Sequence, residues 1–296
     1  MTTGLLVTAF GIDSERMALA LVNSVRRWNE DVGITVLGLD YLCGLDWRGM
    51  ASTRAVRAAG TRGSDERWFN KLAALLESPF DETLYLDSDL VVLEDIRSWF
   101  SYLRTDDFTF FNVRLDPKVV PDRMLYNVVN PHRMKEIYGV PSSPVIESGG
   151  HFFFRRTKRG EQLIHRIASI MEQALDTGAN SIYRMIAGAD NIPASDEIAA
   201  SMMVVEERVS LPHPISGTHR PIGIFMPPYQ HDETFDFDAG KASYIDEWQG
   251  GRVTAGAVHF CAHGKHHSAY LQWIDRTLQG RRNPLQTLPI LLEPKI

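Results

Sequence analysis

One segment, ETLYLDSDLVV from Glu82 to Val92, limits the possible folds of this 296-residue chain more than any other. Its first half is an apolar run typical of a buried β-strand, and it ends on two aspartates, Asp87 and Asp89. In an extended strand, residues two positions apart point the same way and lie about 6–7 Å apart. Two carboxylates at the carboxyl edge of a sheet suit a divalent cation, Mg²⁺ or Mn²⁺, which would remove their repulsion and could hold a diphosphate. The simpler alternative is that they only cap a turn.

The chain before this segment opens with the pattern of a parallel sheet. GLLVTAF (Gly4 to Phe10) and GITVLGLD (Gly33 to Asp40) are typical of strands. Between them, apolar residues recur at helical spacing after Ser14, which we take as the N-cap. This β-α-β order predicts an α/β fold.

The rest of the chain continues the alternation with two irregular parts. A helix is predicted from Asp65 until Pro79, another after Arg156, and a third that follows Ser195 as its N-cap; strands are predicted at 108–113, at 145–156 and within AGAVHFCAHGKHH near the carboxyl end. Residues 114–144 hold five prolines and are predicted to be rich in loops, with at most short helices. Residues 210–250 are predicted to be mostly irregular.

Charge and composition exclude several classes of protein. The net charge of −6 argues against a general nucleic-acid-binding surface, and two cysteines are too few for a disulfide framework. No apolar run approaches the roughly 20 residues that span a bilayer, and the first residues lack the basic region of a secretory signal. We therefore expect a cytoplasmic protein without a transmembrane segment.

Two classes of metal enzyme compete for the paired aspartates. A haloacid-dehalogenase-type phosphatase carries an apolar strand followed by D-x-D-x-T or D-x-D-x-V, which Val91 completes here; Asp87 would then be the nucleophile and Asp89 the acid. That motif usually stands on the first strand of its domain, whereas here at least two strands and two helices precede it. In a nucleotide-sugar glycosyltransferase both aspartates serve the metal. A sugar-1-phosphate nucleotidyltransferase and a non-catalytic sugar-binding relative also stay open.

Five segments in order resemble the retaining glycosyltransferases of family 8, the group of glycogenin and the lipopolysaccharide galactosyltransferases. The segments are VTAFGID, the stretch from Asn70 to Phe100 with Lys71 and the D-x-D, ESGGHFFFRR, SDEIAASMM and VHFCAHGKHH. They match, in turn, the family's first strand and loop, its basic helix and D-x-D strand, its N-S-G-x-x-x-F segment, its acidic helix start and its H-F-x-G-x-x-K-P-W ending. Glu147 replaces the family's Asn or Asp, and His266 and His267 replace its final Pro-Trp.

The resemblance implies a role for each matched residue. It implies a metal site made of Asp87, Asp89 and His259. It implies that Lys265 neutralises the departing diphosphate, that Asp196 binds the transferred sugar and that Glu197 faces the acceptor; we group these three as catalytic. It implies a donor-binding set made of Thr8, Ala9, Phe10, Asp13, Lys71, Ser88, Ser148, Gly149, Gly150, Gly264 and Lys265.

The resemblance also implies the fold and the reaction. We expect a single GT-A (Rossmann-like) domain over residues 1–296, with a central, mostly parallel sheet flanked by helices; residues 1–113 form the nucleotide-sugar half, 114–265 the acceptor half and 266–296 a tail. The reaction would move a hexose from a nucleotide diphosphate sugar, with a UDP-sugar preferred, to an acceptor hydroxyl, with Mn²⁺ or Mg²⁺ and with retention. The acceptor is open: a saccharide, a glycolipid or a small molecule is favoured over a modified nucleic acid. A homodimer is also open.

Overall fold

The protein is described here from a computed structural model. The structure describes residues 1–39, 45, 47, 49–56, 66–111, 113–114, 131–140, 145–146, 149–176, 196–212, 218–225, 227, 230–246 and 251–279. The chain divides into two compact units. The first comprises Met1–Thr2, Ala59–Tyr85 and Phe100–Pro214, and the second comprises Thr3–Ala58, Leu86–Trp99 and Ile215–Ile296.

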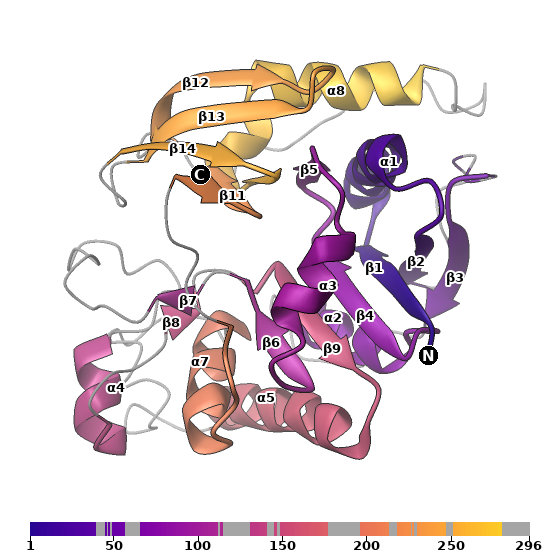
Figure 1. The fold of residues 1–296 in the computed structure, drawn as a ribbon. Helices are drawn as coiled ribbons and strands as arrows, with labels where there is room; N and C mark the ends of the chain where they lie inside the picture. The colour runs from indigo at the N-terminus through magenta and orange to yellow at the C-terminus, as the bar shows by residue number, and fades with distance from the viewer. Residues whose placement is uncertain are drawn as a thin grey trace. The chain divides into compact units, whose positions relative to one another are not determined.

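The second unit begins with the predicted parallel β-α-β arrangement. Strand β1 (Thr3–Ala9) pairs in parallel with β2 (Gly33–Leu39), which pairs in parallel with β3 (Ser52–Val56), as Figure 1 shows. Helix α1 (Ile12–Trp28) packs against β1, and its buried residues are mostly apolar. The sequence analysis did not predict β3.

Helix α1 starts earlier than Ser14, so the prediction of Ser14 as its N-cap was wrong. The N-cap is Gly11, whose φ of 101° is a backbone conformation that side-chain-bearing residues rarely adopt. Glycine is therefore the residue that lets the chain turn directly from β1 into the helix.

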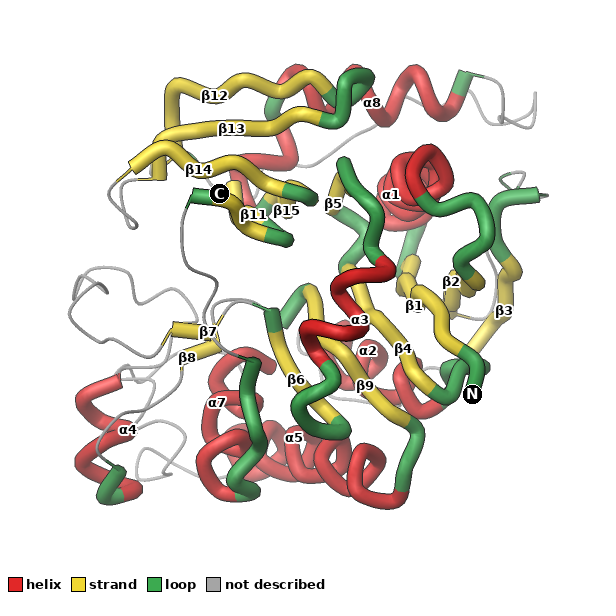
Figure 2. Tube along the Cα trace, viewed as in Figure 1, coloured by secondary structure: helices red, strands yellow, loops and turns green. Residues whose placement is uncertain are grey.

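Residues 210–250 are more ordered than predicted, and the expectation of a mostly irregular segment was wrong for the described part. Antiparallel strands β12, β13 and β14 form a four-stranded sheet with β10, in the order β10-β14-β13-β12; their bounds are His219–Arg220 for β10, Gln230–Asp236 for β12, Lys241–Asp246 for β13 and Gly251–Ala255 for β14. Figure 2 shows β12, β13 and β14 as long yellow tubes. The usual strand signal is weak because Ala242, Tyr244 and Asp246 take the inward positions of β13 and β12 is mostly exposed.

A three-stranded sheet holds the end of the ETLYLDSDLVV segment in place. It has the order β11-β15-β5, with β11 at Gly223–Phe225, β15 at Ala257–Phe260 and β5 at Leu90–Val92. After β15 come a 3-10 turn η3 (Ala262–His266) and helix α8 (Ser268–Leu278), which packs against α1. The predicted last short strand is confirmed, whereas the segment after it, which was predicted to be a loop, forms the 3-10 turn.

The segment from Glu82 to Val92 is two strands and not one. Strand β4 (Glu82–Leu86) ends before Asp87, residues Ser88 and Asp89 form a turn, and β5 then begins at Leu90. The expected placement of both aspartates on one face of an extended strand is therefore wrong. The turn nevertheless brings them together, as described below.

The first unit carries a second group of strands covered by helices. In it β4 neighbours β9 (His151–Arg155), and β9 pairs antiparallel with β6 (Phe108–Phe110). The remaining elements are α2 (Glu66–Leu76), the two-stranded β7 (Val113–Arg114) and β8 (Val145–Ile146), α4 (Pro131–Tyr138), α5 (Lys158–Asp176) and α7 (Asp196–Glu206), while α3 (Arg97–Leu103) runs from the second unit into the first. Helix α5 packs against α7 and α2. Aromatic rings from β4, β6 and β9 stack in the core of the first unit, where Tyr85 and Phe108 both stack on Phe152.

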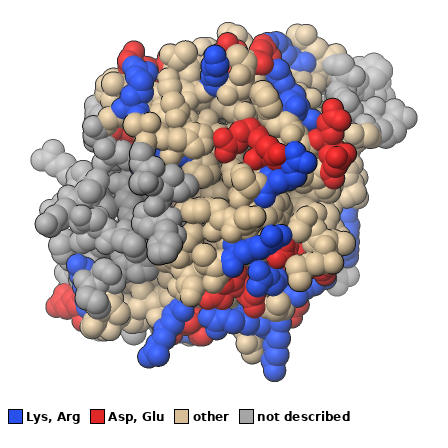
Figure 3. Space-filling view, in the orientation of Figure 1, with Lys and Arg blue, Asp and Glu red and all other residues tan. Residues whose placement is uncertain are grey.

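The predicted fold class is confirmed: the chain is mixed α/β, with a central, mostly parallel sheet flanked by helices. Among the helices that the structure describes, none has both the length and the apolar character needed to cross a bilayer. On the face drawn in Figure 3, acidic and basic side chains are interspersed. The division into a donor half, an acceptor half and a tail stays a prediction, as does a homodimer.

Candidate functional site

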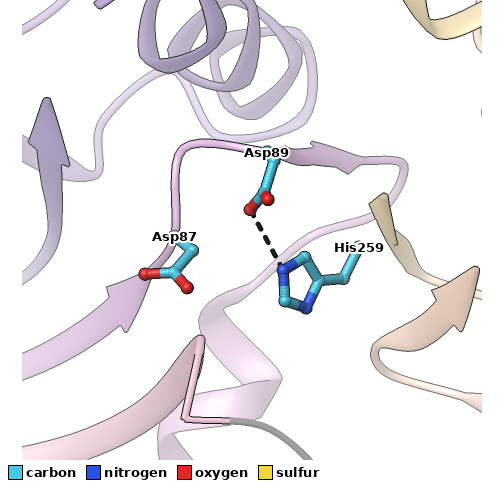
Figure 4. Close-up of side chains that lie close together, drawn as sticks. All are labelled: Asp87, Asp89 and His259. Carbon is cyan, nitrogen blue, oxygen red and sulfur yellow. Dashed lines mark ion pairs between the residues drawn. The ribbon is translucent and has the colours of Figure 1, made fainter. Parts of the chain in front are cut away.

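The two aspartates and His259 converge within the second unit. Asp87 follows β4 and Asp89 precedes β5, while His259 lies on β15, which pairs antiparallel with β5 so that His259 stands opposite Leu90. The Phe260 amide also donates to the Asp89 carbonyl at 2.9 Å. Each of the three side chains offers one ligand atom, and these atoms all lie within 4.8 Å of one another (Figure 4).

The Asp89 carboxylate is buried and is balanced by two cationic groups. His259 Nε2 lies 3.0 Å from Oδ1 and Lys265 Nζ lies 2.7 Å from Oδ2. Burial alone would raise the pKa of Asp89, but the charges of Lys265 and His259 outweigh it and hold the pKa well below its usual range. Within this turn, the chain's own cations offset the negative charge of Asp89.

The pKa values of His259 and Lys265 are shifted upward, opposite to that of Asp89. Burial would lower the pKa of His259, but Cys261 and Asp89 beside it raise this pKa well above its ordinary value. The Asp89 carboxylate raises the pKa of Lys265, although burial opposes this shift. Both groups are therefore positively charged at neutral pH in the absence of a metal.

The residues fit a divalent cation. Two carboxylates and an imidazole are a suitable ligand set for Mn²⁺. Although His259 is at ion-pair distance, Asp89 Oδ1 is buried without a well-directed hydrogen bond from any residue that the structure describes. Such an oxygen is costly unless a ligand satisfies it. The predicted metal ligands are thus brought together, and the identity of the ion stays a prediction.

Lys265 is presented by the tight turn η3, and Gly264 is the residue that allows this turn. A Cβ on Gly264 would lie 2.4 Å from the Phe225 carbonyl oxygen of strand β11, so a larger residue would push the turn off that strand. The Gly264 amide donates to the Cys261 carbonyl at 2.7 Å, and the His267 amide donates to the Gly264 carbonyl at 3.0 Å. Cys261 is a free cysteine.

The predicted base-binding residues lie at the carboxyl end of β1. Thr8 and Ala9 are buried in the strand, and Phe10 is half-buried directly after it. Asp13, in the first turn of α1, is half-buried and lies 3.6 Å from Arg16. Whether these four residues bind a nucleotide stays a prediction.

A second polar cluster lies inside the first unit. Lys71 Nζ donates to the Gly149 carbonyl at 2.8 Å and to Asp196 Oδ2 at 2.9 Å, and it lies 5.5 Å from the centre of the Tyr85 ring. Both charged side chains are only 6% exposed. A Cβ on Gly149 would lie 2.4 Å from the Asp196 carboxylate, which shows how closely the backbone approaches it. The sequence analysis placed these three residues in one site without predicting their mutual contacts.

Asp196 has one oxygen left for another partner. Its Oδ1 is buried and accepts no hydrogen bond from the described residues, while Oδ2 binds Lys71. Asp196 opens helix α7, where the partial positive charge of the helix amino end stabilises a carboxylate. Its Oδ1 is therefore an acceptor that the described residues leave without a hydrogen bond.

The other predicted residues are placed as follows. Ser88 is half-buried in the aspartate turn, Gly150 is buried beside Gly149, and Glu197 is half-buried in the first turn of α7. Ser148 lies outside the described residues. The sequence analysis missed the contact of Lys265 with Asp89, and no local pattern signals a pair so far apart in the chain.

Comparisons with known proteins identify the fold. No family model and no curated protein matches the sequence. Among solved structures, the galactosyltransferase LgtC in complex with donor and acceptor sugar analogs is 13% identical with a TM-score of 0.55, over 93% of this chain and 94% of that one. An active-site mutant of LgtC is likewise 13% identical with a TM-score of 0.56, over 99% and 100% of the two chains.

The glycosyltransferase GlyE of Streptococcus pneumoniae TIGR4, in its apo form, is 16% identical with a TM-score of 0.44, over 71% of this chain. This chain spans only 45% of the length of the GlyE structure. The two LgtC structures, which match nearly end to end, confirm the predicted GT-A fold. The phosphatase alternative finds no support among these structures.

Proposed function

We propose that the protein is a metal-dependent glycosyltransferase that moves a hexose from a nucleotide diphosphate sugar to an acceptor hydroxyl. The convergence of Asp87, Asp89 and His259 at the aspartate turn of a GT-A fold carries this proposal. A UDP-sugar as donor and retention of anomeric configuration follow from the resemblance to family 8. So do Mn²⁺ or Mg²⁺ as the ion and a saccharide, glycolipid or small molecule as the acceptor.

Asp87, Asp89 and His259 would hold the cation, which when bound supplies positive charge for the diphosphate. His259 must be neutral to act as a ligand, so it gives up its proton when the ion binds. Lys265 is 34% exposed and flexible, so it can exchange the Asp89 carboxylate for a phosphate oxygen. There it would offset the negative charge that develops as the bond between the anomeric carbon and the phosphate oxygen breaks.

The cluster in the first unit would bind the sugar. Asp196 Oδ1 is an acceptor that can take a hydrogen bond from a sugar hydroxyl, and Lys71 holds the side chain in orientation through Oδ2. The backbone of Gly149 closely approaches the carboxylate, and its carbonyl accepts a hydrogen bond from the same Lys71 ammonium. Glu197 next to Asp196 would face the acceptor, as the resemblance implies.

Calorimetric titration tests the donor half of the proposal. We expect UDP to bind in the presence of Mn²⁺ and GDP to bind more weakly, and we expect UDP binding to be lost without the ion and in Asp89→Ala. Asp95→Ala is the matched control, because Asp95 is an exposed carboxylate of the same unit that pairs only with Arg97 among the described residues.

Two outcomes would overturn the proposal. One is nucleotide binding that does not depend on a metal or on Asp89. The other is the absence of any nucleotide binding together with Mg²⁺-dependent hydrolysis of a simple phosphate ester, which would make Asp87 a phosphatase nucleophile. Because Asp89→Ala leaves Lys265 and His259 without their counter-charge, Asp87→Asn is titrated in parallel as a milder removal of one ligand.

A further inference from the structure

The turn that carries Lys265 is fastened at its far end by a histidine that the proposed chemistry does not use. His267 follows η3 directly and is the N-cap of helix α8. Its Nδ1 accepts a hydrogen bond from the Ala269 amide at 3.3 Å, and its Nε2 lies 3.0 Å from Glu233 Oε1. One imidazole thus joins the start of α8 to strand β12.

These two contacts indicate which tautomer the neutral ring adopts. An acceptor at Nδ1 cannot carry a proton, so the proton of the neutral imidazole is on Nε2 and is donated to Glu233. Burial would raise the pKa of Glu233, but hydrogen bonds from its own amide and from His267 lower it, so the acceptor is ionised. The result is a carboxylate–imidazole–amide chain with one direction of donation.

Strand β12 is irregular at the point where it presents Glu233. The register with β13 shifts between His231 and Thr234, and Asp232 has a φ of 51°. An extra residue of this kind redirects the side chains around it, at the cost of a strained backbone. The irregular backbone at Asp232 directly precedes Glu233, whose side chain reaches His267.

Aromatic rings hold His267 edge-on. Its ring centre lies 5.5 Å from that of Phe225 and 5.1 Å from that of Phe235, at interplanar angles of 86° and 89°. Phe225 is also the residue whose carbonyl touches Gly264. The ring of His267 and the backbone of the Lys265 turn therefore rest on the same strand, β11.

We propose that Glu233 and His267 form a positioning pair that holds the Lys265 turn at a fixed distance from Asp89. The catalytic role of this pair rests on the proposed function, in which Lys265 leaves Asp89 and binds the diphosphate. If the turn is anchored, this exchange needs a movement of the Lys265 side chain alone. The turn has two anchors, β15 before it and His267 after it. Without His267, the Lys265 ammonium would no longer be held in a fixed position relative to Asp89, and helix α8 would lose its N-cap.

Hydrogen exchange without nucleotide tests the anchoring alone. We expect amides of residues 264–270 to exchange about tenfold faster in Glu233→Ala and His267→Ala, as for the loss of one charge-assisted hydrogen bond. Glu233→Gln keeps an acceptor for Nε2 and should stay within about twofold of the parent. Asp232→Asn is the matched control, because it removes a neighbouring charge of β12 that pairs with Arg252 and not with His267. Asparagine also tolerates the positive φ at this position.

Kinetics separate positioning from simple stability. We expect kcat to fall about tenfold in Glu233→Ala, with a smaller change in donor KM and a small change in thermal midpoint, and we expect Glu233→Gln to restore kcat. The double variant Glu233→Ala, His267→Ala should be no worse than His267→Ala, since both act through one chain of hydrogen bonds.

Unchanged exchange of residues 264–270 in both alanine variants would overturn the pairing. An equal fall in kcat in Glu233→Gln and Glu233→Ala, accompanied by an equal fall in thermal midpoint, would also overturn it. If the parent protein binds no nucleotide, the proposed function fails, while faster exchange in the alanine variants would still establish that the pair holds the turn.

Discussion

Gly149→Ala is the substitution whose effect follows most directly from the structure. The added Cβ would lie 2.4 Å from Asp196 Oδ2, 2.6 Å from its Cγ and 2.7 Å from Oδ1. The nearest of these is 1 Å short of the 3.4 Å at which ordinary contact begins. Either the carboxylate or the backbone of the Gly149 turn must therefore move by about 1 Å.

The size of the effect follows from what holds Asp196 in place. Its Oδ2 is tied to Lys71 at 2.9 Å, and both side chains are buried. Overpacking a buried site costs about 1–3 kcal/mol, and complete separation of a buried ion pair costs about 3–5 kcal/mol. We expect the free energy of unfolding to fall by about 3 kcal/mol. If Asp196 binds the sugar, a displacement of this size should lower kcat/KM on the order of 100-fold.

A double-mutant cycle checks the cause. Urea unfolding and donor turnover are measured for Gly149→Ala, Asp196→Ala and the double variant; if the clash with the carboxylate is responsible, Gly149→Ala costs much less stability when Asp196 is already alanine. Gly251→Ala is the control, since nothing lies within 4 Å of its added Cβ and its φ is outside the left-handed region that favours glycine. An equal cost of Gly149→Ala in both backgrounds would refute the steric explanation.

Three further predictions concern the charges of the second unit. Since His259 is protonated next to Asp89, binding of Mn²⁺ should release a proton and weaken as the pH falls below the raised pKa of His259; calorimetry in buffers of different ionisation enthalpy measures this, and heats independent of the buffer would contradict it. Lys265→Ala should lower kcat about 100-fold with a smaller change in donor KM, as steady-state kinetics would show; an effect on KM alone would argue against a role at the leaving group. Burial raises the pKa of Tyr270 and Tyr244, so both contribute stability below pH 10 that is lost as the pH rises through the folded-state values; an absorbance titration should show them ionising only with unfolding, and two early tyrosinate signals from these residues would oppose this.

The regular elements around the candidate metal site could be predicted because their side chains repeat on one face. Strand β1 is buried from Gly4 onward and the buried residues of helix α1 are mostly apolar, so the sequence pattern and the burial agree. Strands β12 and β13 could not be predicted because their sequences lack the apolar residues that usually indicate a strand. In β13 the buried positions include Asp246, and β12 exposes charged residues on an edge. Such strands are specified by pairing with neighbours, which a local pattern does not reveal.

The residue types of the candidate site could be predicted, while their pairings could not. D-x-D identifies two carboxylates at a sheet edge, and the resemblance to family 8 adds His259. The contacts of Lys71 with Asp196 and of Glu233 with His267 join residues that are 125 and 34 positions apart. No spacing rule relates such residues, because the fold and not the local chain brings them together.

The aspartate turn also shows why two carboxylates can follow a buried strand. Apolar burial of β4 and β5 fixes the positions on either side of the turn, so Asp87 and Asp89 cannot separate to relieve their repulsion. Instead, Lys265 and the protonated His259 neutralise Asp89, and they do so from a strand and a turn that the same small sheet anchors. A divalent cation that entered would have to displace one proton and one ammonium. Its binding would therefore be an exchange of positive charges, in which the displaced ammonium of Lys265 would become available to a diphosphate.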